Sequence, residues 1–279
     1  MKKTVFLAAL AALCLGAASC NHKAEEPKIS IFCDHIETIA QQEGISFAEA
    51  ATLLKEAGYT GADIRVFQKP GEIKTLDSLG FAHACAITDI NYSRGDQKEL
   101  EDKTLAFLKE QGFERLLLVT GLMPGQGYSK ADREAARSRI ADFAARVTAE
   151  GFDIVVEDYD NRRSLCYDKA LLDSLFAVSK DLGLAYDSGN FLFAGDDPVG
   201  SLKHFLDRVK HVHLKDRTSP TDMTCKPVGT GCIQMETIIR TLKESGYKGW
   251  LTVEQYGSRQ MLEDSRTSIR NVQAILAGE

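Results

Sequence analysis

Short apolar segments alternate with longer amphipathic segments along most of this chain. From residue 29 onward, the short runs have the length of buried strands, and the segments between them repeat their apolar residues with a helical period. This alternation is typical of a parallel sheet covered by helices. The eight runs that we interpret as strands are Ile29–Phe32, Gly61–Val66, Phe81–Ile87, Leu116–Val119, Asp153–Val156, Leu184–Tyr186, Val209–Leu214 and Trp250–Val253.

The segments between the predicted strands contain start and stop signals for helices. Ser46 opens a capping-box pattern, and Gly58 ends the helix that follows it. Ser129 opens a longer helix whose apolar residues repeat at i, i+3, i+4 and i+7 and which ends before Gly151. A third helix should begin at Asp197-Pro198. Its predicted apolar face consists of Leu202, Phe205, Leu206 and Val209.

Eight strand–helix units in about 250 residues match the size of a (β/α)₈ TIM barrel. We therefore predict one barrel domain over residues 29–279, with its functional site at the carboxyl ends of the strands. An open, doubly wound sheet is the alternative. That alternative is less favoured because no Gly-x-Gly-x-x-Gly pattern follows the first strand and no change of composition marks a second domain.

The first nineteen residues have the composition of an export signal. Two lysines precede an apolar run, Val5–Ala18, that is too short to span a membrane comfortably. The run ends in small residues followed by Cys20, and this ending resembles a bacterial lipoprotein signal. We expect a signal peptide at 1–19, a lipidated Cys20, a polar tether at 20–28, and an exported periplasmic or cell-surface protein held to a membrane by its lipid alone. An ordinary cleaved signal with an incidental cysteine is the alternative.

Overall composition narrows the classes of partner. The 279 residues are 44% hydrophobic and 27% charged, which is enough apolar material for a full core. A net charge of -6 leaves no broadly basic face, so the composition argues against a nucleic-acid partner. The seven cysteines form no Cys-x-x-Cys motif, and a zinc knuckle is therefore not supported.

Acidic or metal-ligating side chains end each of the last four predicted strands. The endings are "DIVVE" at Glu157, "GLAYD" at Asp187, "KHVH" at His213 and "WLTVE" at Glu254. In a barrel these ends converge, and three carboxylates placed together would repel one another. A divalent cation between them removes this repulsion. Three oxygens and one imidazole suit Mn²⁺, Mg²⁺ or Co²⁺ better than they suit a structural zinc.

Each of these side chains also has a purely structural interpretation. Glu157 would cap the next loop, and Asp187 would form an Asx turn with Gly189. Glu254 would pair with a basic side chain.

We further expect only one of the two strand histidines to face the barrel centre. The better candidate is His213, which lies nearer the carboxyl end, and His211 would then face a helix.

The chain from about Lys28 to its end resembles the xylose isomerase-like TIM-barrel superfamily of sugar phosphate isomerases and epimerases. The resemblance rests on the ordered set "VVEDY", "YDSGN", "HVHLKD", "PVGTG" and "GYKGWLTVE". It implies one divalent metal ion, with Mn²⁺ the first choice and Mg²⁺, Co²⁺ or Zn²⁺ the others. The ligands that it implies are Glu157, Asp187, His213 and Glu254.

The resemblance also implies a reaction. Two glutamates on opposite sides of a sugar, Glu157 and Glu254, would move a proton next to a carbonyl, which gives an isomerase or epimerase. The alternatives are a lyase or dehydratase acting on a keto-glycoside, and a carbohydrate-binding lipoprotein without turnover. The fold alone does not choose among them.

Some positions depart from the family pattern. Many relatives have a histidine three residues after the aspartate of the sixth strand, where this chain has Asn190, so we expect Asn190 to bind a substrate hydroxyl. Lys215 would bind substrate or steady negative charge, although Lys215 and Arg217 could equally be solvated loop charges. The DNA-cutting relatives need further histidines that this chain lacks. Because phosphorylated sugars are mainly cytoplasmic, an exported enzyme should act on a sugar or keto-sugar without phosphate.

Overall fold

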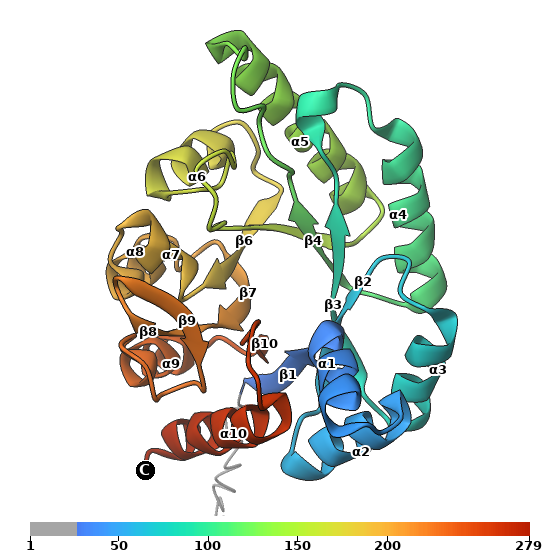
Figure 1. The fold of residues 1–279 in the computed structure, drawn as a ribbon. Coiled ribbons are helices and arrows are strands. Elements are labelled where there is room, and N and C mark those ends of the chain that lie inside the picture. The colour runs from blue at the N-terminus through green and yellow to red at the C-terminus, as the bar shows by residue number, and fades with distance from the viewer. Residues whose placement is uncertain (1–26) are drawn as a thin grey trace, which may run out of the picture.

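The computed structural model describes residues 27–279 of the chain, and these form a closed barrel of eight parallel strands (Figure 1). Strand β10 closes the barrel by pairing with both β1 and β7. The predicted TIM barrel is therefore confirmed, and the open sheet is excluded. The strands are β1 (Lys28–Phe32), β2 (Gly61–Arg65), β3 (Ala82–Asp89), β4 (Arg115–Val119), β5 (Asp153–Glu157), β6 (Leu182–Asp187), β7 (Val209–Leu214) and β10 (Trp250–Val253).

Helices cover the outside of the barrel between successive strands (Figure 1). Beyond the carboxyl end of β7, the strands β8 (Asp216–Ser219) and β9 (Asp222–Lys226) form an antiparallel hairpin. The helices are α1 (Cys33–Glu43), α2 (Phe47–Ala57), α3 (Pro70–Ser78), the short 3₁₀ helix η1 (Tyr92–Arg94), α4 (Lys98–Gln111), α5 (Lys130–Ala149), α6 (Lys169–Phe176), α7 (Asn190–Ala194), α8 (Pro198–His204), α9 (Met235–Glu244) and α10 (Met261–Ala277).

The predicted strands agree with the observed ones to within two residues at every boundary. The helix predicted from Asp197 is correct at its start, where the Asp197 side chain accepts a hydrogen bond from the Gly200 N–H, but it is too long. Helix α8 ends at His204, because the chain must turn before Val209 pairs with Leu184 as the first residue of β7. Strand pairing therefore overrides the helical period.

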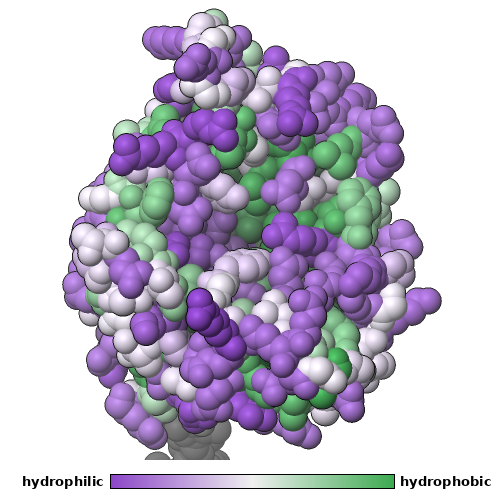
Figure 2. Space-filling model, viewed as in Figure 1, coloured by the Kyte–Doolittle hydropathy of each residue, from purple (hydrophilic) through white to green (hydrophobic). Residues whose placement is uncertain are grey.

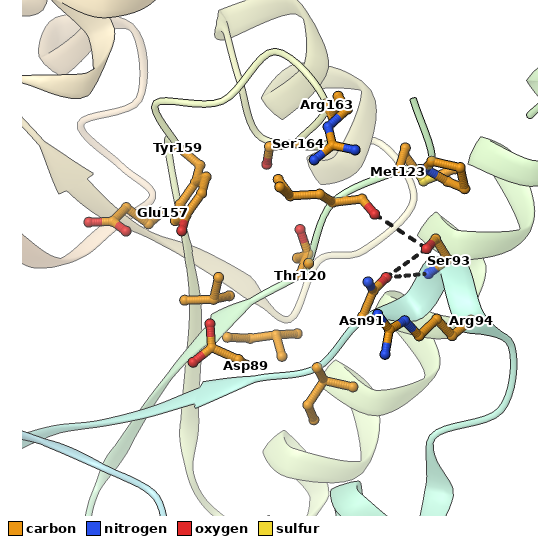
Figure 3. A pocket seen from close by; sticks show the side chains of 16 residues that line it. Asp89, Asn91, Ser93, Arg94, Thr120, Met123, Glu157, Tyr159, Arg163 and Ser164 are labelled. Carbon is orange, nitrogen blue, oxygen red and sulfur yellow. Dashed lines mark hydrogen bonds between the residues drawn. The ribbon is translucent and has the colours of Figure 1, made fainter. Parts of the chain in front are cut away.

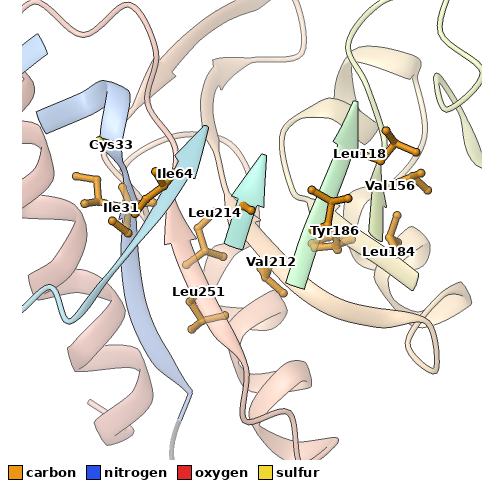
Figure 4. Packing of buried hydrophobic residues seen from close by; sticks show 14 of the residues in the cluster. Ile31, Cys33, Ile64, Leu118, Val156, Leu184, Tyr186, Val212, Leu214 and Leu251 are labelled. Carbon is orange, nitrogen blue, oxygen red and sulfur yellow. The ribbon is translucent and has the colours of Figure 1, made fainter. Parts of the chain in front are cut away.

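Two apolar regions lie on the two sides of the barrel wall. The outward side chains of the strands, among them Ile31, Leu118 and Tyr186, pack beneath the helices (Figure 4). A smaller cluster fills part of the barrel interior. Its buried members are Phe32, Cys85, Ile87, Leu117, Val155 and Ala185. The apolar part of the interior therefore comes mainly from β3 to β6.

The opposite part of the barrel interior is polar. It contains Ser30, Asp63, His211, His213 and Thr252, all buried, which come from β1, β2, β7 and β10. Both histidines lie inside, since both contact Asp63. Our expectation that His211 faces a helix is wrong. Side chains alternate along a strand with a period of two, so residues 211 and 213 share one face.

The predicted signal peptide, the lipidation site Cys20 and most of the predicted tether lie outside the described residues. The predicted tether extends one residue too far, because Lys28 is already the first residue of β1. In the same part of the chain, no helix combines the length and the apolar character that crossing a bilayer requires.

Helix α5 provides a test of the local signals that position the barrel. Ser129 caps it reciprocally with Asp132, and Ser129→Ala should lower the free energy of unfolding by about 1 kcal/mol because the first turn loses this cap. Urea unfolding measures the change. The control is Ser138→Ala, an exposed serine in the same helix, which should leave stability within about 0.5 kcal/mol. Equal losses in the two variants would contradict the capping role.

Candidate metal centre

The four predicted strand-end side chains come together at the carboxyl end of the barrel. Glu157 and Asp187 are the last residues of β5 and β6, His213 lies near the end of β7, and Glu254 directly follows β10. Each offers one ligand atom, and these atoms all lie within 4.8 Å of one another. All four side chains are buried. The structure therefore places together a histidine and three carboxylates, the set of donors that the sequence suggested.

His213 is held by carboxylates on both sides of its ring. Its Nδ1 lies 2.5 Å from Glu157 Oε1 and 3.4 Å from Glu254 Oε2, and its Nε2 lies 3.2 Å from Asp63 Oδ2. Burial alone would lower the pKa of His213, but the neighbouring Glu157 and Asp63 raise it well above its usual value. Nδ1 faces the other three ligands, so it is the ring nitrogen available to a cation.

Asp63 is a residue of this site that the sequence analysis missed. It stands in the middle of β2 and accepts hydrogen bonds from His211 Nε2 at 2.7 Å and from Thr252 Oγ1 at 3.0 Å. Ser30 Oγ in turn lies 2.7 Å from Thr252 Oγ1. A carboxylate between Ala62 and Ile64 in the middle of the strand "GADIR" was the signal that could have identified it. Asp63 contacts His213 Nε2, the ring nitrogen that faces away from the other three ligands, and so fixes the orientation of the ring, as carboxylates beside metal-ligating histidines do.

Asp187 combines the structural and the ligand interpretations. Its Oδ1 accepts the backbone N–H groups of Gly189 at 2.7 Å and Asn190 at 2.8 Å, which is the Asx-type turn named above as the alternative. Its Oδ2 is buried without a hydrogen bond, although Lys215 Nζ lies 3.1 Å away. One oxygen therefore fixes the turn, and the other accepts no hydrogen bond and makes only an ionic contact, with Lys215.

Lys215 lies among the acidic side chains. Its ammonium contacts Glu254 Oε1 and Asp187 Oδ2 and donates to Asn190 Oδ1 at 3.0 Å. Burial would lower the pKa of this amine, but Asp187 and Glu254 raise it well above its usual value. Lys215 is only 6% exposed, so the interpretation as a solvated loop charge is wrong for it.

Asn190 and Arg217 form the rest of this polar wall. The Asn190 Nδ2 donates to the Asp158 carbonyl at 2.7 Å, and its Oδ1 lies 3.3 Å from Arg217 Nη2. Arg217 is 5% exposed and also donates to the Met223 carbonyl in the β8–β9 hairpin at 2.6 Å. The solvated-loop interpretation is therefore wrong for Arg217 too. Both side chains border the cavity above the four strand ends.

The charges in this cluster fit a divalent cation. Three carboxylates face one ammonium and one imidazolium, so negative charge remains in excess. Burial raises the pKa of Glu254 to about 8, and the neighbouring carboxylates raise it further. Lys215 lowers this pKa, but its effect is smaller than that of burial. A hard cation with oxygen and imidazole ligands would relieve this excess, and its binding would release the proton on His213 Nδ1.

A cavity of about 520 Å³, which we call the metal chamber, opens above the four strand ends. Figure 2 shows the hollow near the middle of this face of the molecule, with polar side chains beside an apolar patch. Aromatic side chains contribute to the chamber wall through Phe32, Tyr159 and Tyr256. Sequence reasoning did not identify these three, because Phe32 reads as an ordinary apolar strand residue and Tyr159 and Tyr256 are single aromatic residues in loops. The volume and mixed lining are typical of a small-molecule site.

Solved structures of related fold support the architecture. The probable 3-DHS dehydratase AsbF of Bacillus anthracis superposes with a TM-score of 0.73 at 14% identity, over 88% of this chain and 98% of that one. D-allulose 3-epimerase of a Methylomonas species gives a TM-score of 0.72 at 14% identity, over 90% and 98%. A xylose isomerase-like TIM barrel protein of Mycobacterium smegmatis in complex with magnesium gives 0.64 at 18%, over 83% and 88%. At these identities the likeness shows the fold.

Curated relatives and a family model carry the comparison further. An inosose dehydratase of Clostridium beijerinckii is 31% identical over 101 residues, and this match spans only 30% of the chain and about a third, 34%, of the relative. An inosose dehydratase of Clostridium botulinum strain Alaska E43 is 32% identical over 252 residues, or 75% of this chain and 82% of the relative. The model of the xylose isomerase-like TIM barrel matches residues 51–275. The chain therefore belongs to the xylose isomerase-like TIM barrel family.

Proposed function

We propose that this protein is a divalent-metal-dependent sugar isomerase or epimerase that moves a proton next to a carbonyl group. The observation that supports this most directly is the convergence of Glu157, Asp187, His213 and Glu254, with ligand atoms within 4.8 Å of one another at the floor of a cavity. A site that only bound sugar would have no need for buried carboxylates of which one has a raised pKa.

These four residues would hold the cation, with Mn²⁺ as the first choice and Mg²⁺, Co²⁺ or Zn²⁺ as the others. When bound, the cation would polarise a keto or hydroxy oxygen of the sugar. Asp187 Oδ2, which accepts no hydrogen bond, and His213 Nδ1 would be two of its ligand atoms, and the cation would compete with the Lys215 ammonium for Oδ2. The other oxygen of Asp187, Oδ1, accepts a hydrogen bond from the Gly189 N–H, which keeps the aspartate in position.

The two glutamates would act on carbon-bound protons. Glu157 and Glu254 border the chamber from the ends of β5 and β10, with His213 between them. One carboxylate removes a proton beside the carbonyl and the other returns one. Return to the opposite face gives an epimer, and return to the neighbouring carbon gives an aldose–ketose isomer. Lys215 and Asn190 would bind substrate oxygens and stabilise the negative charge that develops.

A lyase or dehydratase is the second candidate, and the match to inosose dehydratase favours it. Elimination begins with the same proton removal but ends with loss of an adjacent oxygen, which needs a proton donor. Burial raises the pKa of Glu254, so this glutamate can take up the removed proton and pass it to the leaving oxygen. The two candidates therefore use the same residues and differ in the product.

Solvent exchange tests the proposal. The Mn²⁺-loaded protein is incubated in deuterium oxide with a panel of unphosphorylated ketoses and keto-sugars, and proton NMR follows deuterium uptake at carbon. Uptake with a new sugar stereoisomer supports the isomerase or epimerase, and uptake with an unsaturated product supports the lyase. Binding of sugars without any exchange would contradict both and favour a carbohydrate-binding lipoprotein.

The first prediction concerns the cation. Asp187→Asn keeps an oxygen for the turn at Gly189 but removes the charged ligand, so Mn²⁺ affinity should fall at least about 100-fold while the barrel stays folded. Calorimetric titration and metal analysis measure the affinity. The control is Asp160→Asn, a carboxylate at the chamber rim outside the cluster, which should bind Mn²⁺ normally. Full metal content in Asp187→Asn would remove Asp187 from the site.

The second prediction separates binding from proton transfer. Glu157→Gln and Glu254→Gln keep an oxygen near the cation but lose the base, so each should retain some metal and lose turnover by about 10²-fold or more. One of the two variants should still exchange a single substrate proton with solvent without completing conversion. Near-normal turnover in either variant would exclude that glutamate from the reaction.

We also propose that the mature protein is exported and begins at a lipidated Cys20, because residues 1–20 have the pattern of a lipoprotein signal. Cys20→Ala should abolish labelling by a radioactive fatty acid and release the protein from membranes. The control is Cys232→Ala, which changes an exposed cysteine of the barrel and should leave labelling unchanged. Labelling that survives in Cys20→Ala would refute the anchor.

A further inference from the structure

A second cavity adjoins the metal chamber. This second chamber has a volume of about 590 Å³ and is formed by the loops that follow β3, β4 and β5 (Figure 3). The two chambers share four lining residues, Asp89, Val119, Glu157 and Tyr159. Each chamber alone has the volume of an ordinary ligand site, so together they offer more room than one sugar ring fills. Glu157 stands at the border between them.

The loops around the second chamber are tied to one another. The Met123 N–H donates to the Arg163 carbonyl at 2.9 Å, and Leu122 forms an isolated β-bridge with Ser164. Ser93 Oγ donates to the Leu122 carbonyl at 3.3 Å (Figure 3). The segments that follow three different strands are therefore connected through residues 122–123. These contacts give the second chamber walls that are in place before a ligand binds.

Positive charge is in excess in the second chamber. Arg94 and Arg163 line its open side from different directions (Figure 3). Both side chains are exposed, and within residues 27–279 neither guanidinium has a hydrogen-bond or ion-pair partner. The chamber's two carboxylates are occupied, because Asp89 pairs with Arg65 at 3.1 Å and Glu157 contacts His213. Two arginines without partners at one cavity are suited to an anion, and the planar guanidinium matches a carboxylate in particular.

We propose that the second chamber binds a carboxylate-bearing ring that is linked to the reacting sugar, so that the substrate is an acidic disaccharide or a similar glycoside. This inference rests on the proposed function, which places the reacting sugar in the metal chamber. Arg94 and Arg163 recognise the carboxylate, and Ser93, Thr120 and Ser164 give the chamber a polar wall beside the hydroxyls of the second ring. The bond between the two rings passes Glu157 and Tyr159.

The test measures binding rather than turnover. Calorimetric titration of the Mn²⁺-loaded protein compares glucose, cellobiose and cellobiouronic acid, in which a glucuronate replaces one glucose of cellobiose. The acidic disaccharide should bind at least about tenfold more tightly than the neutral one, the scale of one charge-assisted hydrogen bond. Arg94→Gln and Arg163→Gln should each lose about tenfold for the acidic disaccharide and little for the neutral one.

Arg162→Gln is the matched control. Arg162 is as exposed as its neighbour Arg163 but lines a different cavity with Tyr167 and Leu192, so this variant should keep the wild-type preference. An equal loss in Arg162→Gln would show a general effect of surface charge and overturn the inference. So would the absence of any preference in the wild-type protein, or displacement of the bound disaccharide by an equal concentration of inorganic phosphate.

The outcome is independent of the solvent-exchange experiment. A preference for the acidic disaccharide without deuterium uptake in any sugar would contradict the proposed reaction and support the second chamber. Deuterium uptake without the preference would support the reaction and contradict the second chamber.

Discussion

The two-sided hold on His213 is the interaction on which the rest of the site depends. Glu157 lies 2.5 Å from its Nδ1 and Asp63 lies 3.2 Å from its Nε2, so the ring joins opposite parts of the barrel through its buried centre. Asp63 is in turn fixed by His211 and Thr252. Buried polar groups must be paired, so the polar part of the interior forms a chain that ends at the ligand nitrogen. Without Asp63, the Nε2 side of the imidazole would lose its carboxylate partner, and only the contacts on the Nδ1 side and the Phe32 ring would orient it.

Electrostatic repulsion sets the second constraint. Two like unit charges about 4 Å apart repel by about 4 kcal/mol at an effective dielectric constant of 20, which is a large share of the 5–15 kcal/mol that stabilises a folded domain. Three buried carboxylates therefore need cations even before a metal binds. Lys215 and the protonated His213 supply them, which explains why burial does not lower the pKa of either group. Two single positive charges therefore partly balance the carboxylates of the candidate metal centre.

The sequence predicts the barrel and the four strand ends well, because both follow from short-range patterns. Apolar runs define the strands, and a charged residue at the end of such a run is conspicuous. Longer-range information is missing from those patterns. Asp63 was missed because its partner His213 comes 150 residues later in the chain. The helix after Asp197 was predicted to be too long because Val209, which fits the helical period, pairs with Leu184 in β7. The error over His211 had a different origin, since the period of a strand already places it beside His213.

The position of Glu157 connects the choice of reaction with the size of the substrate. It borders both chambers together with Tyr159, so a substrate that spanned the chambers would have its linking oxygen beside the glutamate to which we assign proton removal. Burial raises the pKa of Tyr159, whose hydroxyl therefore stays protonated and able to donate a hydrogen bond to that oxygen. Proton removal from a single ring can end only in isomerisation, epimerisation or loss of water. With a second ring, the same step can be followed by expulsion of the linking oxygen. In the proposed reaction, the loops after β3, β4 and β5 would therefore set which leaving groups the site can accept, while the four strand ends would carry out the proton removal that both candidate reactions share.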